Sequence, residues 1–274
     1  MSGGVPCPEL AAAIAAAWPA GGARPAVEGW LRCDSTMERA RAWHARDRLD
    51  HAAVVSLEQT EGRGRRGRRF VSPPGGLYLT AILPAPAHLE HAFRIGLAAA
   101  VAARRAVAAL RGPEIAFEWP NDLVVGRGKV GGILSELVAG PGQPGPPVVL
   151  VGVGLNVGPD PGSVDPRHAG PAARLEMPPG SAIPALAATL LAEIDALHGV
   201  LDDERRWQDV LERLERGLAG LRRRVELRRA DGTLVSGTML GIARDGALRV
   251  LRADGREVRV RYGEPVRDLP TRGG

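Results

Sequence analysis

GRGRRGRR (residues 62–69) decides between two kinds of fold. Its glycines fit the G-x-G-x-x-G pattern of dinucleotide-binding folds, in which a strand precedes the glycines and a helix follows them. A β-rich run, AAVVSLEQ (52–59), precedes the stretch, but VSPPGG (71–76) follows it and leads into a second β-rich run, GLYLTAIL (76–83). Because proline and glycine interrupt helices, the sequence predicts a strand–loop–strand unit and disfavours a doubly wound dinucleotide-binding fold.

Residues 62–69, here named the arginine loop, also suggest a type of ligand. A P-loop would need G-K-[ST], which occurs nowhere in the chain, and an RNA-binding loop would interleave aromatic residues, of which only Phe70 is adjacent. Glycine lets the backbone approach a ligand closely, and arginine binds phosphate and carboxylate. We therefore expect residues 61–70 to form a lid that is poorly ordered when empty and becomes ordered over a triphosphate or acyl phosphate.

Outward from this loop, many short strands alternate with few helices. We expect strands at 26–33, 114–119, 123–125, 128–138 and 147–157, and helices at 36–47, 91–110, 183–199 and about 203–218. Ser35 or Thr36 is the expected N-cap of the first helix. This order favours an α+β architecture over regular βαβ alternation.

The C-terminal segment has a different character. Residues 223–269 contain five short segments with the alternation of strands, and Asp-Gly pairs occur at 231–232, 245–246 and 254–255. Asp-Gly favours the tight turns of β-hairpins. The segment therefore predicts a small β-barrel, with a domain boundary near residue 219.

Composition and charge narrow the class of protein. The chain of 274 residues is 45% hydrophobic, and its formal charge of +5 equals the charge of the arginine loop alone. No apolar run is long enough to cross a membrane, and the N-terminus makes a poor signal peptide. Cys7 and Cys33 offer neither a disulfide framework nor metal-ligand spacing. We expect a cytoplasmic protein that binds no membrane.

Rare residues add a second signal. The chain has 36 lysines and arginines together, of which only Lys129 is a lysine, and its only asparagines are Asn121 and Asn156. Such a bias towards arginine is typical of GC-rich coding sequence. Where lysine and asparagine are this scarce, the retained ones are candidates for functional roles.

Five motifs in order carry a family resemblance: DST (34–36), EQTEGRGRRGR (58–68), EWPNDL (118–123), GKVGGILSE (128–136) and GVGLN (152–156). With these motifs, residues 27–270 resemble the biotin–protein ligases, also called biotin–[acetyl-CoA-carboxylase] ligases. The resemblance implies a mixed β-sheet with helices packed on one face, followed by an SH3-like β-barrel. It divides the chain into an N-terminal extension (1–26), a catalytic domain (27–218) and an SH3-like domain (219–274).

The resemblance also implies a reaction in two steps. Biotin and ATP, with Mg²⁺, give biotinyl-5′-AMP, and the biotinyl group then passes to a lysine of biotin carboxyl carrier protein. The residue types suit this chemistry, because a carboxylate that attacks a phosphate needs fixed cations where the two anions meet.

Residue roles follow from the same resemblance. The implied biotin contacts are Ser35, Thr36, Met37, Gln59, Arg63, Gly64, Arg65 and Lys129. The implied ATP contacts are Arg63, Arg65, Arg68, Phe70, Asn121, Asp122 and Asn156. Arg65, Lys129 and Asp122 are the candidate catalytic residues, and Asp122 is the candidate ligand of Mg²⁺, which prefers oxygen donors.

Four positions depart from the family's usual pattern. Met37 stands where asparagine is usual, and Phe70 where tryptophan is common. Glu61 replaces a small or basic residue, and Glu118 replaces a basic one. Glu118 matters most, because it brings negative charge to a predicted phosphate site.

The partners and the alternatives complete the sequence-based prediction. The expected acceptor is the carrier protein of acetyl-CoA carboxylase, and the prediction leaves room for a homodimer. Only about 26 residues precede the resemblance, too few for a DNA-binding domain. The alternatives are a lipoate–protein ligase and a non-catalytic protein that binds biotin or nucleic acid.

Overall fold

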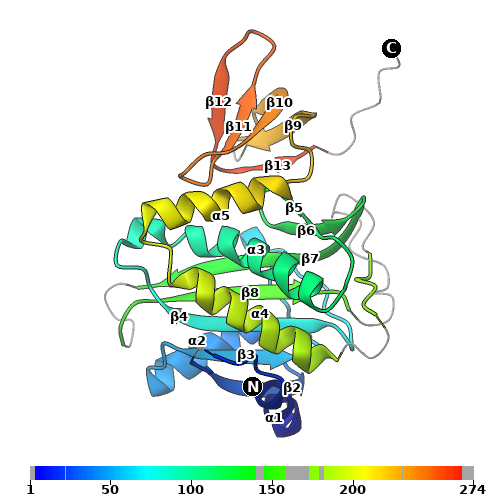
Figure 1. The fold of residues 1–274 in the computed structure, drawn as a ribbon, viewed down its shortest axis with the longest axis vertical. Helices are drawn as coiled ribbons and strands as arrows, with labels where there is room; N and C mark the ends of the chain where they lie inside the picture. The colour runs from blue at the N-terminus through cyan, green and yellow to red at the C-terminus, as the bar shows by residue number, and fades with distance from the viewer. Residues whose placement is uncertain are drawn as a thin grey trace.

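An eight-stranded sheet forms the centre of the main unit in the computed structural model (Figure 1). The structure describes residues 4–21, 23–139, 145–157, 173–178, 182–229 and 231–266. The strands lie in the order β1-β2-β3-β4-β8-β7-β6-β5, and β2 pairs with β3 in parallel, whereas the other pairs are antiparallel. Their bounds are β1 (Val5–Pro6), β2 (Ala26–Arg32), β3 (Ala52–Ser56), β4 (Leu77–Pro84), β5 (Ala116–Glu118), β6 (Asp122–Val125), β7 (Gly128–Val138) and β8 (Val148–Leu155).

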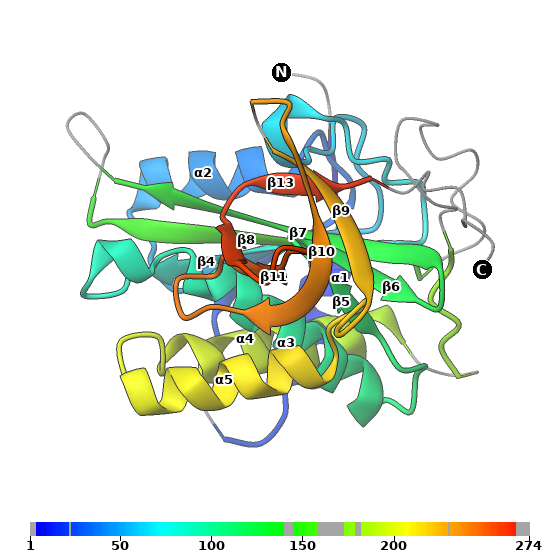
Figure 2. The same cartoon turned by 90° about the horizontal axis from the view of Figure 1, so that it is seen from above.

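Helices lie on both sides of this sheet, with a larger group on one side and α2 (Thr36–Asp47) on the other (Figure 2). The first group is α1 (Pro8–Ala16), α3 (Arg94–Ala109), α4 (Ile183–His198) and α5 (Glu204–Arg216). The helix α2 lies on the opposite face, where Met37 and Ala40 pack in a smaller core with Val54, Ile82 and Leu150. The predicted mixed sheet and α+β class are confirmed, but α2 departs from the expected placement of the helices on one face.

The central strands are apolar on both faces because helices cover both. Leu77 to Leu83 of β4 are all buried, as are all residues of β3. Such continuous burial explains why these segments show long apolar runs instead of strict alternation. The alanine-rich α3 packs closely against β7, β8 and the neighbouring α4, since alanine side chains allow a short distance between elements.

A second, five-stranded antiparallel sheet packs beside α5 and β5 and is strongly curled (Figures 1 and 2). Its strands are β9 (Arg224–Arg229), β10 (Leu234–Ile242), β11 (Leu248–Leu251), β12 (Glu257–Val260) and β13 (Gly263–Pro265), in the order β12-β11-β10-β9-β13. Gly246 and Gly255, in the predicted Asp-Gly turns, have φ of 77° and 78°, a region that glycine adopts without strain. The expected C-terminal β-sheet is therefore present.

The N-terminal segment described from residue 4 is part of the main unit. Strand β1 pairs with β2, and Leu10 and Ile14 of α1 are buried in the main core. The predicted domain limits at residues 26 and 219 remain predictions. Two short 3₁₀ turns, η1 (Arg65–Gly67) and η2 (Leu89–His91), complete the description, and no helix among the described residues is long and apolar enough to span a membrane.

Candidate active site

A cavity of about 150 Å³ lies between the arginine loop, the start of α2 and the strands β4, β7 and β8. Every predicted site residue except Asn156 lines it: Ser35, Thr36, Met37, Gln59, Arg63, Gly64, Arg65, Arg68, Phe70, Asn121, Asp122 and Lys129. These residues come from four separate segments of the chain. The fold therefore assembles in one place the residues that the motifs singled out.

The floor of the cavity depends on glycines in β8. A Cβ atom at Gly154 would lie 2.6 Å from the ring of Phe70, and one at Gly152 would lie 2.9 Å from Cε of Met37. Real Cβ atoms do not approach other atoms so closely. The GVGLN motif thus lets Phe70 and Met37 lie directly against the backbone of the sheet.

Polar side chains around Gln59 form a fixed network at one end of the cavity. The Oε1 atom of Gln59 accepts hydrogen bonds from the backbone N–H (2.8 Å) and the hydroxyl (3.0 Å) of Thr36. Its Nε2 donates to Ser72 Oγ at 2.9 Å, and Thr80 Oγ1 donates to Thr36 Oγ1 at 2.9 Å. Because these bonds fix the amide orientation and the Thr36 rotamer, this end of the cavity is preorganised.

Ser35 occupies the N-cap position of α2, but its side chain does not cap the helix. Its Oγ atom is buried and has no hydrogen-bond partner among the described residues. A buried hydroxyl without a partner carries a desolvation cost, which a polar ligand atom in the cavity would remove. The position fits the predicted N-cap, and the unused hydroxyl fits the predicted ligand contact.

The sole lysine forms an ion pair inside the cavity. Lys129 Nζ lies 2.8 Å from Asp122 Oδ1, and the two side chains are only 15% and 20% exposed. Antiparallel pairing of β6 with β7 brings the two residues together, and Lys129 Nζ also lies 5.9 Å from the ring centroid of Phe70. The candidate cation for a ligand carboxylate is thus already held by a protein carboxylate.

The arginine loop contacts three separate parts of the fold. Arg63 forms an ion pair with Glu38 of α2 at 2.7 Å, and an NH1 N–H of Arg65 donates to Asn121 Oδ1 at 3.1 Å. Arg68 pairs with Glu264 of the second sheet at 2.6 Å. The loop therefore lies across the cavity with one anchor in each part.

Burial and neighbouring charges shift the pKa values of two groups at this loop. Burial lowers the pKa of Arg65, and the neighbouring charge of Arg66 lowers it further, while Glu264 and Asp122 act in the opposite direction. Burial by itself raises the pKa of Glu264, but the hydrogen bond from Arg68 and the charges of the loop arginines outweigh it and hold that pKa below its usual value. Glu264 is thus a carboxylate that the loop keeps ionised.

Glu264 is also the main residue that sequence reasoning missed. It lines the cavity with Pro265, although it lies 196 residues beyond Arg68 in the chain. Other lining residues outside the predicted set include Arg69, Tyr78, Thr80, Glu118, Trp119 and Pro120. Burial, and then the charge of Glu58, raises the pKa of Tyr78, so its hydroxyl stays protonated. Of the six residues named, Glu118, Trp119 and Pro120 lie within the motif EWPNDL, and these three carried a signal in the sequence.

Asn156 does not line the cavity. Its Nδ2 donates to the carbonyl oxygens of Lys129 (3.5 Å) and Ala173 (3.3 Å), and its backbone N–H donates to Val130 O at 2.8 Å. In this structure the second asparagine ties the start of β7 to the segment around Ala173. Its predicted contact with ATP stays a prediction.

The residues present fit a metal ion only in part. Among the described residues there is no group of three or more His, Cys, Asp or Glu side chains arranged to hold one. Mg²⁺ bound with a nucleotide usually takes one or two protein carboxylates, the remaining ligands being phosphates and water. Asp122 can supply one such carboxylate, so the cavity fits a cation that arrives with phosphate groups.

We predict that Glu264→Gln loosens the arginine loop. The substitution removes the charge that pairs with Arg68 at 2.6 Å and Arg66 at 3.6 Å. Trypsin should then cleave the loop several times faster in the absence of ligand, with a change in unfolding free energy below ~1 kcal/mol, as for other exposed pairs. Because the folded-state pKa of Glu264 is lowered, this contact is present above that pKa and is lost as the pH falls through it, so hydrogen exchange of the loop amides should show less protection below that pKa.

Glu257→Gln is the matched control for this experiment. It breaks the pair of 2.9 Å hydrogen bonds between Arg249 and Glu257, which lies on the same small sheet but away from the loop. Cleavage that rises equally in both variants would show that the effect comes from the small sheet and not from the loop contact.

The part of the chain that forms the cavity is similar to known proteins. The profile of the Biotin/lipoate A/B protein ligase family matches residues 32–156, which contain nearly all of the cavity. A Biotin–[acetyl-CoA-carboxylase] ligase of Paracoccus denitrificans is 41% identical over 119 residues, covering 42% of this chain and 49% of the relative. A ligase of the same name from Mycobacterium tuberculosis is 31% identical over 156 residues, covering 52% of this chain and 55% of the relative. The alignments thus span about half the length of these relatives.

A solved structure extends the similarity to most of the fold. The biotin protein ligase of Aquifex aeolicus in complex with biotin and ATP superposes with a TM-score of 0.72 at 22% identity, covering 88% of this chain and 97% of that one. At this level of identity the likeness establishes a shared architecture.

Proposed function

We propose that this chain, whose residues 32–156 match the model of the Biotin/lipoate A/B protein ligase family, is an ATP-dependent biotin–protein ligase. Biotin and ATP form biotinyl-5′-AMP and pyrophosphate, and a lysine of biotin carboxyl carrier protein then takes the biotinyl group and releases AMP. One observation carries the proposal: the polar network around Gln59 and the cations Lys129 and Arg65 line a single cavity.

The first step joins two anions, and the cations of the cavity reduce the repulsion between them. A carboxylate oxygen of biotin attacks the α-phosphorus of ATP, and the bond to pyrophosphate breaks. Lys129 lies at 2.8 Å from a carboxylate already and can share its ammonium with incoming carboxylate and phosphate oxygens. Arg63 and Arg65 supply further charge from the loop. Mg²⁺, held through Asp122 and the phosphates, would neutralise charge on ATP.

The other end of the cavity recognises the biotin head group. The ureido group of biotin carries both donors and an acceptor, and it needs partners of both kinds. The unpartnered hydroxyl of Ser35 and the ordered Thr36–Gln59 pair provide them. Removal of any one buried partner would leave a ligand atom unsatisfied, which gives selectivity for that head group.

The second step needs protection from water. The neutral amine of the acceptor lysine attacks the acyl carbon, an amide bond forms, the amine loses a proton and AMP leaves. Water would attack the same mixed anhydride. The arginine loop, lying across the cavity on its three anchors, excludes water until the acceptor arrives.

Pyrophosphate exchange tests the proposal. The purified chain with ATP, Mg²⁺ and biotin should incorporate radiolabelled pyrophosphate into ATP, and omission of biotin should abolish the incorporation. Addition of a purified biotin carboxyl carrier protein should then give a carrier one biotinyl group heavier by mass spectrometry, with the label on a lysine.

Two other outcomes would replace the proposal. The family description also covers lipoate ligases, so exchange that depends on lipoate and not on biotin would assign lipoyl transfer. Biotin binding without any exchange would assign a non-catalytic binding protein.

The same proposal includes four further points: the cytoplasmic location, the carrier of acetyl-CoA carboxylase as acceptor, the homodimer and the division at residues 26 and 219.

We expect Glu118→Lys to lower the KM for ATP. Glu118 lines the cavity and pairs through its backbone with Asp122, so its carboxylate adds negative charge beside the predicted phosphate contacts. Reversal of this charge should lower the KM about three- to tenfold, since one charge close to a phosphate in a partly solvated site contributes on the order of 1 kcal/mol. The measurement is the ATP dependence of biotin-dependent exchange.

Glu114→Lys is the control, because it makes the same change in charge at a side chain that is 89% exposed. An increased KM together with a lower melting temperature for Glu118→Lys would contradict the prediction and indicate that the carboxylate stabilises a loop arginine.

A further inference from the structure

A second cavity, about 660 Å³, opens directly beside the candidate active site. One wall is the start of α3, the opposite wall is the turn at residues 244–246 with Arg261 and Tyr262, and the floor is β7. We name it the side groove. Residues shared by the two cavities form the boundary between them: Arg65, Trp119, Pro120, Asn121, Ile133 and Leu134.

Hydrogen bonds hold the wall that the second sheet provides. The indole N–H of Trp207 donates to Arg244 O at 3.2 Å, and that of Trp119 donates to Gly246 O at 3.3 Å. Phe93 fills the space beside Gly246, where an added Cβ atom would lie 2.9 Å from its ring. The groove between the two units is therefore built from fixed elements and keeps its shape without a ligand.

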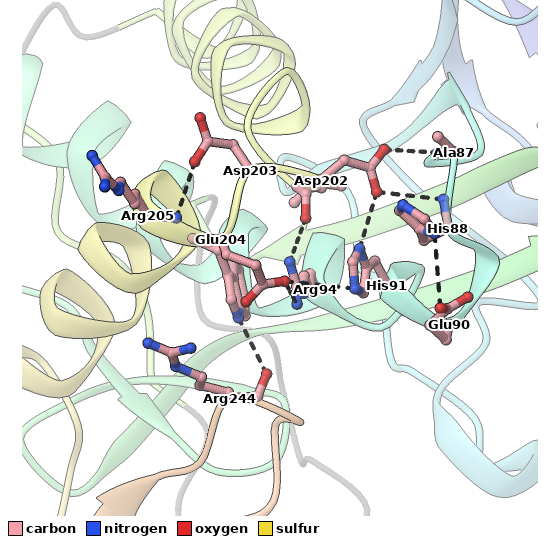
Figure 3. A network of polar contacts seen from close by, with 12 residues as sticks. Ala87, His88, Glu90, His91, Arg94, Asp202, Asp203, Glu204, Arg205 and Arg244 are labelled. Atoms are coloured by element: carbon pink, nitrogen blue, oxygen red, sulfur yellow. Dashed lines mark hydrogen bonds and ion pairs between the residues drawn. The ribbon is translucent and has the colours of Figure 1, made fainter.

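A polar network holds the opposite wall (Figure 3). His91 Nδ1 lies 3.0 Å from Asp202 Oδ1, and NH1 of Arg94 donates to Leu201 O at 2.6 Å. The guanidinium of Arg94 also pairs with Glu204, and the residue is buried. These contacts tie the start of α3 to the connection between α4 and α5, so the second wall is as fixed as the first.

The rim of the groove has the composition of a protein-binding surface. Tyr262 is 67% exposed and Phe93 is 37% exposed, although large apolar side chains are normally covered. Arg244 and Arg261 are also exposed, and Arg261 pairs with Asp245 at 2.9 Å. Exposed tyrosine and arginine around an apolar floor are typical of the residues that dominate binding energy between proteins.

Arg65 occupies the passage from the groove to the reacting atoms. It lines both cavities, and its hydrogen bond to Asn121 Oδ1 closes the boundary at 3.1 Å. A side chain that arrives along the groove therefore meets a guanidinium that donates a hydrogen bond to a neutral amide oxygen. Such a contact is weaker than an ion pair and can open when a long side chain enters.

We propose that the side groove is the docking site for the folded acceptor protein, which inserts its target lysine past Arg65. The inference rests on the proposed function, because a second entrance for a macromolecule is needed only if the enzyme transfers the biotinyl group to a protein. Three arginines are accessible along the groove, Arg65, Arg244 and Arg261, against two acidic side chains, whereas the fourth lining arginine, Arg94, is buried against Glu204. The acceptor that fits this surface has acidic side chains beside its lysine and an apolar contact for Tyr262.

Tyr262→Ala tests the proposal with three readouts. Biotin-dependent pyrophosphate exchange reports the first step. Cleavage of the preformed enzyme–adenylate complex by hydroxylamine reports reactivity towards a small amine that needs no docking. Single-turnover transfer to purified carrier protein reports the complete second step. We expect the first two rates to stay within twofold of the unsubstituted enzyme and the KM for the carrier to rise at least tenfold, which corresponds to ~1.4 kcal/mol of binding.

Leu234→Ala is the matched control, since Leu234 is a 51% exposed apolar residue at the far end of β10. It should leave all three readouts unchanged. Arg244→Glu, which reverses a charge on the rim without touching the buried contacts of its carbonyl, should reproduce the effect of Tyr262→Ala and weaken the dependence of transfer on salt.

Each other outcome overturns the inference. Normal carrier transfer by Tyr262→Ala would show that the acceptor docks elsewhere, and an equal loss in the hydroxylamine reaction would show that Tyr262 acts on the chemistry. A shift in oligomeric state with unchanged transfer would assign the groove to a second copy of the chain. Absence of exchange in the unsubstituted enzyme would instead overturn the proposed function, and with it the inference.

Discussion

Lys129→Arg is expected to lower the rate of biotin-dependent pyrophosphate exchange about a hundred- to thousandfold, the usual cost of one misplaced catalytic charge. The ammonium of Lys129 lies 2.8 Å from Asp122 Oδ1 in a site where both side chains are mostly buried. A guanidinium at this position has a wide planar fork, and it would pair with both oxygens of Asp122. The cation would then stay on the protein carboxylate instead of following the reacting oxygens.

The measurement is exchange combined with a thermal melt. The melting temperature should stay within a few degrees, because positive charge and the ion pair with Asp122 are both kept. Arg249→Lys, which makes the opposite replacement in the Arg249–Glu257 pair, should leave exchange unchanged. Near-normal exchange by Lys129→Arg would show that the lone lysine reflects coding composition and carries no special role.

Arg65→Ala is expected to release the adenylate from the enzyme. The substitution removes a largely buried cation from the cavity and its 3.1 Å hydrogen bond to Asn121, so it opens the boundary towards the side groove as well. Loss of one hydrogen bond to a charged group costs ~1.5–3 kcal/mol, which corresponds to a dissociation of biotinyl-AMP about ten- to a hundredfold faster.

A lysine-rich bystander protein detects the released adenylate. The chain has only Lys129 and its N-terminal amine as primary amines, so label should collect on the added protein and hardly on the enzyme. Arg46→Ala, which removes a mostly exposed guanidinium of α2 that does not line the cavity, should retain the adenylate. Equal labelling of the bystander by Arg65→Ala and the unsubstituted enzyme would rule out this role for Arg65.

Local patterns predicted the elements of this fold well. The run GKVGGILSELV was expected as a strand at 128–138, and β7 has those bounds, because β-branched and glycine residues there leave no helical periodicity. The Asp-Gly pairs predicted the turns of the small sheet, since few other pairs adopt that backbone at low cost. The motifs also contain most of the residues that line the cavity, but not Tyr78, Thr80 or Glu264.

What the sequence did not predict depends on contacts between distant segments. The placement of α2 on the second face of the sheet follows from Met37 and Ala40 packing on strands far away in the chain. The pairing of Lys129 with Asp122 depends on a register shift between β6 and β7, and the contact of Glu264 with Arg68 crosses 196 residues. No local propensity encodes such contacts, because they follow from the packing of the whole chain.

The contact between Glu264 and the arginine loop has a consequence for the biosynthesis of the protein. Ribosomes make the chain from its N-terminus, so the loop and the whole main sheet leave the exit tunnel while Glu264 is still inside it. A nascent chain can therefore fold a cavity with its cations in place but without the carboxylate that anchors the loop. Strand β13 brings this carboxylate to the loop after the cavity has formed, so closure of the cavity follows its assembly.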